Sequence, residues 1–401
     1  MPFSSPAQPV PPKPPRFEMR MSALYAVAFL AMGIHIPFFP LWLRHVDFSP
    51  EQIGLILAIP MIVRIISVPV LTGLGDKARD RADVLFLSAV AAFFASLGYF
   101  FTPDYWLVLA ISVLIAAFWT PHVPLIDSIA QSGVRRFATD YTRLRIWGSI
   151  AFVVINLAGG AVLGVFGAGA VPALFAASLS LMVVTALLAP RLGKPRISSP
   201  LGGGFLKGGS ALWSRPFLLL AGACGLIMGS HGFLYAFGSI YWLSLGIDDA
   251  TIGILWAWGV VAEVALFAVF TRSLGFLNSK QVIILGGSLA VLRWALFPLI
   301  WPLGGGLPGF FFLQTLHAFS TGLMLIGIQK VIVELIGEDQ AGAAQGVAYL
   351  SNGTAMALVT LGAGYLYEGF GSGGYFAMAV LAATGTLFAL MAQPQRSALG
   401  G

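Results

Sequence analysis

Long apolar segments alternate with short polar loops along most of the chain. A bilayer core is about 30 Å thick, so a helix that crosses it needs roughly 20 mostly apolar residues. Only α-helices and closed barrels satisfy their backbone groups inside lipid, and uninterrupted runs of this length are not barrel strands. The pattern therefore predicts an all-α membrane protein with twelve transmembrane helices, at 21–43, 52–72, 83–101, 106–130, 146–166, 172–189, 216–243, 251–271, 281–301, 309–331, 342–366 and 374–393.

The basic residues lie mainly on one side of these predicted spans. Of 22 Lys and Arg residues, 18 fall in the tails and loops on the side of the N-terminus, and the loops of the other side hold only Arg44. Short cytoplasmic loops of membrane proteins carry such an excess of positive charge. We therefore expect a multi-pass protein of the inner (plasma) membrane with both termini in the cytoplasm.

A basic loop rich in Gly, Ser and Pro follows the sixth predicted span. Such a composition is typical of a flexible linker. We expect the N-terminal residues not to pack, because they are rich in proline. We also expect no cleavable signal, because a full-length apolar run follows them directly. The predicted domains are a disordered cytoplasmic tail at 1–20, a six-helix half at 21–189, a cytoplasmic linker at 190–215 and a second six-helix half at 216–401.

The two halves share a short sequence pattern. A Trp-Leu pair ends the first and the seventh span, and an Ile-Gly pair opens the span that follows each of them. Ten residues beyond each of these glycines lies a charged residue, Arg64 in the second span and Glu263 in the eighth. Two parallel six-span repeats are known from transporters that bind substrate between the halves near the membrane midplane.

Composition excludes several classes of protein. Charged residues make up 9% of the chain and hydrophobic residues 58%, whereas soluble domains carry roughly 25% charged residues. The net charge of +6 comes from inter-helix loops, so no nucleic-acid partner is expected. The one cysteine, Cys224, excludes a disulfide framework and a cysteine-based metal site. No phosphate-binding loop or HExxH motif is present, so we expect no cofactor, no metal and no enzymatic activity.

Ionisable residues inside predicted spans are the first candidates for function, because a charge at the bilayer centre costs about 2.5–3.5 kcal/mol on insertion scales. A structural ion pair or a polar bridge between helices is the alternative for each of them. His317 shares a helix face with Gln314 and Thr321. Trp256 precedes Glu263 by seven residues and lies on its face, whereas Trp242 is expected in the interfacial belt. The candidates are Arg64, Asp127, Glu263, Arg293, His35, His122, His231 and His317.

Four segments together resemble the phenylpropionic acid permease family of the major facilitator superfamily. They are residues 231–267, residues 141–149, the pair Arg293-Trp294, and residues 314–319. More distantly, residues 37–43 and 367–371 are similar to lactose permease. The resemblance covers essentially all twelve spans. It implies the major facilitator fold, with two six-helix pseudo-repeats, and symport of a substrate with protons into the cytoplasm.

The resemblance to lactose permease also implies roles for single residues. Asp127 falls on the substrate-binding acid of the fourth span and Arg145 on the arginine that pairs with it. Glu263 falls on the acid that joins substrate binding to coupling. Arg293 and His317 fall on the arginine and histidine of the ninth and tenth spans, so the three residues Glu263, Arg293 and His317 are expected to carry proton coupling.

The sequence departs from that relative at several of these positions. Ser320 replaces an acid that titrates, Gln314 replaces a lysine, and His231 replaces an aspartate. We therefore expect Glu263 to carry the proton and Asp127 to stay ionised beside Arg145. The expected substrate-binding residues are Asp127, Arg145, Glu263, His231, Trp256 and Gln314. The loop after the second span keeps part of the superfamily's gating motif, in Asp76, Lys77 and Arg79.

Three classes of function remain open at this point. The first is proton-coupled uptake of a small organic solute, with an aromatic carboxylate such as 3-phenylpropionate favoured and a sugar or nucleoside as alternatives. The second is export of a drug or metabolite by the same fold. The third is a membrane sensor or enzyme that transports nothing. For the first class the partners are a small-molecule substrate, protons and the lipid bilayer, and the protein is expected to be a monomer.

Overall fold

The computed structural model describes residues 12–101, 103–193, 211–336 and 340–393. Throughout these ranges the ordered elements are helices, and no strand occurs among the described residues. The predicted all-α membrane fold is confirmed. The tail before residue 12 and most of the predicted linker lie outside the described residues.

The described residues before the predicted linker form seven α-helices and two short 3-10 helices. Aspartate, asparagine or serine side chains cap several helices throughout the chain, and Ser49 and Gln52 form a capping box at the start of α2. The elements are α1 (Phe17–His45), α2 (Pro50–Lys77), α3 (Arg81–Ser96), η1 (Leu97–Phe100), α4 (Tyr105–Trp119), α5 (His122–Phe137), α6 (Tyr141–Phe166), η2 (Ala168–Ala170) and α7 (Val171–Leu187).

Seven further α-helices lie in the described residues after the predicted linker. The capping carboxyl of Asp248, just before α10, accepts hydrogen bonds from Thr251, and these bonds lower the pKa of Asp248. The elements are α8 (Arg215–Gly229), α9 (Gly232–Ser244), α10 (Asp249–Ser273), α11 (Ser279–Leu296), α12 (Gly306–Leu335), α13 (Ala341–Phe370), η4 (Gly371–Gly373) and α14 (Gly374–Met391).

Within the described ranges, ten helical runs are long and apolar enough to cross a membrane. One of these runs, Ala341–Met391, contains both α13 and α14, and the 18-residue α11 is not among the ten. The described helices are therefore compatible with the twelve predicted spans, but the count of twelve stays a prediction.

Two predicted spans are interrupted near their middle. The fourth is broken between α4 and α5, where Pro121 lacks the N–H that would continue the helical ladder. The seventh is broken between α8 and α9 at Ser230 and His231. There Gly229 lies against the α13 backbone, since a Cβ on it would be 3.0 Å from the carbonyl carbon of Ala355. The apolar runs in the sequence continue through both interruptions, so hydropathy does not predict them.

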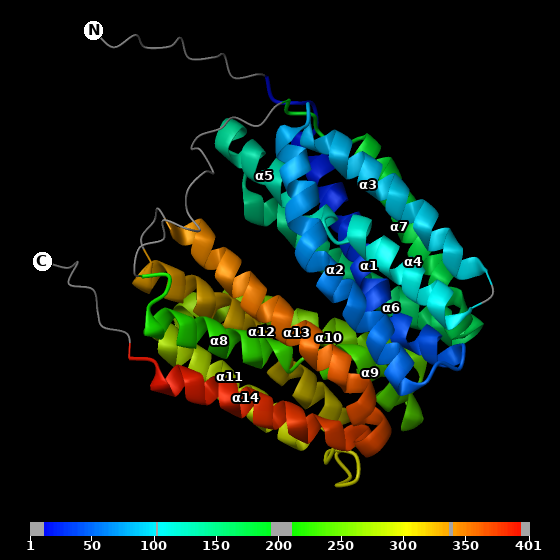
Figure 1. Cartoon of the computed structure of the whole chain (residues 1–401), viewed down its shortest axis with the longest axis vertical. Coiled ribbons are helices and arrows are strands. Elements are labelled where there is room, and N and C mark those ends of the chain that lie inside the picture. The colour runs from blue at the N-terminus through cyan, green and yellow to red at the C-terminus, as the bar shows by residue number, and fades with distance from the viewer. Residues whose placement is uncertain (1–11, 102, 194–210, 337–339, 394–401) are drawn as a thin grey trace, which may run out of the picture.

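Figure 1 shows the helices in two groups, α1–α7 and α8–α14, which converge at one end and spread apart at the other. The most extensive contacts between the groups join α1 with α9, α2 with α13, and α6 with α10. Glycines permit the closest approaches. A Cβ on Gly253 would lie 2.2 Å from the carbonyl oxygen of Asn156, and one on Gly54 would lie 3.0 Å from the backbone nitrogen of Gly364.

These two glycines are the glycines of the Ile-Gly pairs that the halves share. The sequence pattern therefore marks the seams where the two groups of helices meet. One aromatic prediction is wrong. Trp242 is not an interfacial belt residue but is fully buried, in contact with Trp256, Phe297 and Phe310.

Candidate functional site

A buried polar cluster lies in the second group of helices, between α8–α9, α10, α11 and α12. Its centre is Arg293 of α11, whose side chain has 0% exposure. Arg293 Nε donates to the carbonyl oxygen of Leu313 (2.9 Å) and Nη2 donates to Gln314 Oε1 (2.7 Å). The guanidinium carbon lies 4.3 Å from the ring centroid of Trp294. Gln314, in turn, donates from Nε2 to the carbonyl oxygen of Leu255 on α10 (2.9 Å).

Two histidines lie next to this arginine. His231, at the break between α8 and α9, has Nε2 2.9 Å from Ser320 Oγ and Nδ1 3.1 Å from the carbonyl oxygen of Ile227. The ring centroids of His231 and His317 are 5.4 Å apart. Ser320, which stands where the distant relative has an acid, thus serves as a hydrogen-bond partner of His231.

Glu263 of α10 lies where this cluster faces the first group of helices. Its side chain is half-buried, and its Oε2 accepts a hydrogen bond from Thr321 Oγ1 (2.8 Å). Arg145 of α6, in the other group, is close enough to attract this carboxylate at long range, although the two side chains form no ion pair among the described residues. The sequence had placed Arg145 with Asp127, so the structure adds a second acid to the reach of this arginine.

Asp127 of α5 is held by two tyrosines. Its Oδ1 accepts hydrogen bonds from Tyr25 on α1 (2.5 Å) and Tyr141 on α6 (2.9 Å). In the described part of the chain, Asp127 forms no ion pair with Arg145. The Arg145 guanidinium carbon instead lies 5.5 Å from the ring centroid of Tyr25 and 4.3 Å from that of Phe29. Tyr25 therefore connects the two residues that the sequence had paired directly.

The two tyrosines were not among the predicted site residues. Tyr141 lies inside one of the motifs that carried the family resemblance, so a signal for it existed. Tyr25 had none, because its approach to Asp127 depends on how α1 packs against α5 and α6.

Trp256 lies at the edge of the polar cluster. Its Nε1 donates to Ser239 Oγ (2.8 Å), and its ring centroid is 5.9 Å from that of Tyr235. Tyr235 lies near both Glu263 and Arg293. Trp256 is therefore an aromatic wall beside the charged groups, and only a small part of it is exposed.

Some buried polar atoms of the cluster have no hydrogen-bond partner among the described residues. They include Arg293 Nη1, His317 Nδ1 and the hydroxyl of Tyr375. An unsatisfied buried polar group costs about 1–3 kcal/mol, and more when the group is charged. These atoms are free to bind polar groups of a ligand or water.

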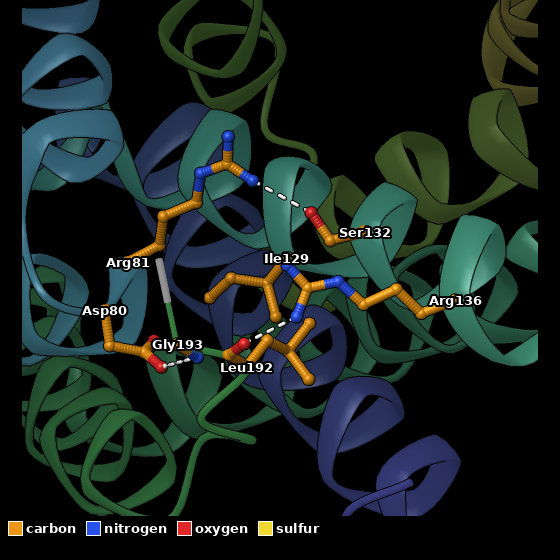
Figure 2. Close-up of a pocket in the computed structure, with 7 residues that line it drawn as sticks. All are labelled: Asp80, Arg81, Ile129, Ser132, Arg136, Leu192 and Gly193. Carbon is orange, nitrogen blue, oxygen red and sulfur yellow. Dashed lines mark hydrogen bonds between the residues drawn. The ribbon is translucent and has the colours of Figure 1, made fainter. Parts of the chain in front are cut away.

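The predicted gating loop lies at the end of α2, remote in sequence from this cluster. Asp76 pairs with Arg81 (2.5 Å), and Arg81 Nη1 also donates to Ser132 Oγ of α5 (2.9 Å). Asp80 Oδ2 accepts from the backbone N–H of Gly193 (2.7 Å), as Figure 2 shows. Lys77 and Arg79 are exposed. The pocket beside this loop, lined by Asp80, Arg81, Ser132 and Gly193 among others, is only about 10 Å³, too small for an organic substrate.

Comparison with known proteins gives results that agree with this architecture. The model of the MFS_1 like family matches residues 18–378. The chain is 27% identical over 359 residues to a probable 3-phenylpropionic acid transporter of Escherichia coli, covering 89% of this chain and 93% of that protein. It is 27% identical over 387 residues to a maltose permease of Geobacillus stearothermophilus, covering 93% of this chain and 94% of the permease.

Solved structures share the fold. The crystal structure of the nucleoside transporter NupG superposes with a TM-score of 0.77 and 16% sequence identity, covering 94% of this chain and 98% of NupG.

Proposed function

The chain belongs to the MFS_1 like family and is a multi-pass membrane transporter, and on this premise we propose that it imports a small aromatic carboxylate together with protons. The proposed location is the inner membrane, with both termini in the cytoplasm. The proposed working unit is a monomer in which the helices before and after the linker act as two six-helix domains. The transporters it resembles are not enzymes, and neither is this chain.

The buried guanidinium of Arg293 is the observation that carries the choice of substrate class. This cation is fully buried, and no carboxylate forms an ion pair with it among the described residues. Its Nη1 is unsatisfied, and so is Nδ1 of the neighbouring His317. A carboxylate that accepts from these donors would offset the cost of burying the charge. The rings of Trp256 and Tyr235 offer apolar surface for an aryl group nearby.

We assign the transported proton to Glu263. A half-buried carboxyl that faces a cation on the other domain gains or loses that cation as the domains move. It can therefore be neutral in one state and charged in another, which is what proton coupling requires. Arg293 and His317 tune the field around it. Asp127 accepts hydrogen bonds from Tyr25 and Tyr141, and Tyr25 in turn positions Arg145.

The remaining candidates take supporting roles. Gln314 is hydrogen-bonded to Arg293, and His231 is hydrogen-bonded to Ser320. Gln314 and His231 therefore shape the substrate site without supplying a charge. Trp256 lines it. The loop containing Asp76, Lys77 and Arg79 is proposed to gate the cytoplasmic side, with Asp76 fixed by Arg81 in the present state.

A sugar or nucleoside is the second candidate substrate. It is favoured by the maltose permease relative and by the fold shared with NupG. The unsatisfied hydroxyl of Tyr375 and the amide of Gln314 are the kind of neutral polar groups that sugars use. Export of a metabolite by the same fold is the third possibility, and it differs in the direction of net flux.

Proteoliposomes with an imposed inward proton gradient separate these possibilities. We expect protein-dependent accumulation of radiolabelled 3-phenylpropionate, but not of maltose or uridine. Protein-free liposomes are the control, because an aromatic acid also crosses lipid in its neutral form. Accumulation of only maltose or uridine would contradict the proposal that the substrate is a carboxylate. Net efflux of substrate under the same inward proton gradient would contradict import.

A further inference from the structure

Arg64 is a charged residue of the second predicted span that the proposed site does not use. It lies near the middle of α2, between Val63 and Ile65. Its side chain is exposed, and in the part of the chain that the structure describes it has no carboxylate at ion-pair distance. Its guanidinium carbon lies 5.6 Å from the ring centroid of Tyr349 on α13, in the other group of helices.

The place of Arg64 along the seam between α2 and α13 is distinctive. The two helices are in backbone contact at Gly54 and Gly364, and a Cβ on Gly353 would still be 4.0 Å from Ile65. Towards the end of α2 the helices diverge (Figure 1), and Ile66, Val70 and Leu74 are more than half exposed. Arg64 therefore lies where the seam opens, on the side of the molecule where α2 ends.

The contact with Tyr349 does not account for a charge near the middle of a helix that is long and apolar enough to cross a membrane. A cation–π contact contributes about 0.5–1 kcal/mol at an exposed site and about 2 kcal/mol when desolvated. The cost of a charge at the bilayer centre is about 2.5–3.5 kcal/mol. The ring leaves all five N–H donors of the guanidinium available, and their fork geometry matches a carboxylate.

We propose that Arg64 binds anions at the inner mouth of the substrate path. When no anion is bound, its guanidinium rests on the ring of Tyr349. It attracts the carboxylate of a substrate that leaves Arg293 for the cytoplasm, or of one that returns. This inference rests on the proposed function, because it assumes an anionic substrate and cytoplasmic termini. The attraction itself is a property of the protein and can be measured without any substrate.

The first experiment measures the charge of the mouth directly. Tyr349→Cys in a Cys224→Ser background gives one thiol beside Arg64. The thiol is modified with two methanethiosulfonate reagents, one with an anionic ethylsulfonate group and one with a cationic trimethylammonium group. The rate with the anionic reagent is divided by the rate with the cationic one. A change in thiol acidity affects both rates alike, so the ratio reports the local potential. We expect Arg64→Gln to lower this ratio about tenfold, in the range by which such fields alter encounter rates, and Arg64→Lys to retain most of it.

The second experiment measures transport from each side. In Arg64→Gln with Tyr349 intact, we expect the KM for 3-phenylpropionate to rise at least tenfold when it is offered from the cytoplasmic side. The KM from the outside should be unchanged. Tyr349→Phe keeps the ring and is the matched control, expected to behave as the wild type.

The outcomes separate this inference from the proposed function. A labelling ratio that Arg64→Gln leaves unchanged overturns the inference, whatever the substrate is. An equal rise of KM from both sides also overturns it, because that result places Arg64 at the central site. A lowered ratio in a protein that does not transport 3-phenylpropionate supports the anion-attracting mouth and contradicts the proposed substrate.

Discussion

The unsatisfied nitrogens are the most informative single atoms of the site. Arg293 donates from Nε to a backbone carbonyl and from Nη2 to Gln314. These two hydrogen bonds fix the plane of the guanidinium, and Nη1 has no partner among the described residues. A side chain held in this way is preorganised, so little conformational entropy remains to be lost when an anion binds. The geometry therefore matters as well as the charge.

Substitutions of Arg293 distinguish geometry from charge. Lys retains the positive charge but not the planar fork, so we expect Arg293→Lys to weaken binding of 3-phenylpropionate by about tenfold or more, since one charge-assisted hydrogen bond contributes about 1.5–3 kcal/mol. Arg293→Ala should abolish measurable binding. Isothermal titration of the purified protein measures both. Gly164→Ala is the control for purification and storage, because a Cβ at this position of α6 meets no described residue within 4 Å. Wild-type affinity in Arg293→Lys and Arg293→Ala would exclude the carboxylate clamp.

How far single residues could be predicted depends on what positions them. The sequence indicated Glu263, Arg293, His231, His317 and Gln314 through depth in the membrane, helix spacing and family resemblance, and the structure brings them into one region. The roles assigned to them stay predictions. Tyr25 was missed, because its bond to Asp127 joins residues 102 positions apart and leaves no local pattern.

At the scale of helices, glycines determine how closely the two groups approach. A Cβ on Gly160 would lie 2.7 Å from the carbonyl oxygen of Asp249, and the Gly253 contact is closer still. Both belong to the α6–α10 seam, at the end where the groups converge. Any side chain there must push α6 and α10 apart. We infer that the packed seam holds the molecule closed at this end, which is the outer side in the proposed topology.

Gly253→Val tests this inference, with Gly253→Ala as a milder variant that adds the same Cβ. We expect either change to open the outer seam and favour the opposite conformation. A cysteine at Ala250, in the Cys224→Ser background, should then react with a membrane-impermeant maleimide several-fold faster from the outside. Gly164→Val, on α6 with no atom within 4 Å of its Cβ, is the matched control. Equal labelling rates in Gly253→Val, Gly164→Val and the parent would show that the seam does not set the conformation.

The sequence predicted where the helices lie, but it did not predict where two of them are interrupted. The apolar runs located the helices because length and hydropathy are local properties. The break before His122 depends on a proline, and the break at Ser230 and His231 depends on contact with α13. Such contacts depend on the packing of distant segments, which an apolar run does not encode.

For the whole molecule, the relation between the two groups of helices links the site to transport. Arg145 and Glu263 belong to different groups and interact across the seam, so a change in the angle between the groups changes the field at the Glu263 carboxylate. The sequence repeat predicted two similar halves. It could not predict how they are tilted, because that angle results from a few close backbone contacts.

Substitution of Glu263 by Gln gives the most direct test of proton-coupled uptake. Gln preserves the size of the side chain and an oxygen for the hydrogen bond from Thr321, but it cannot hold a transported proton. Uptake of 3-phenylpropionate into proteoliposomes under an inward proton gradient is measured for both proteins, after subtraction of uptake into protein-free vesicles. We predict accumulation above equilibrium by the wild type, and none by Glu263→Gln, which should still exchange internal for external substrate. Accumulation at the wild-type level in Glu263→Gln would contradict the assignment of the proton to this residue.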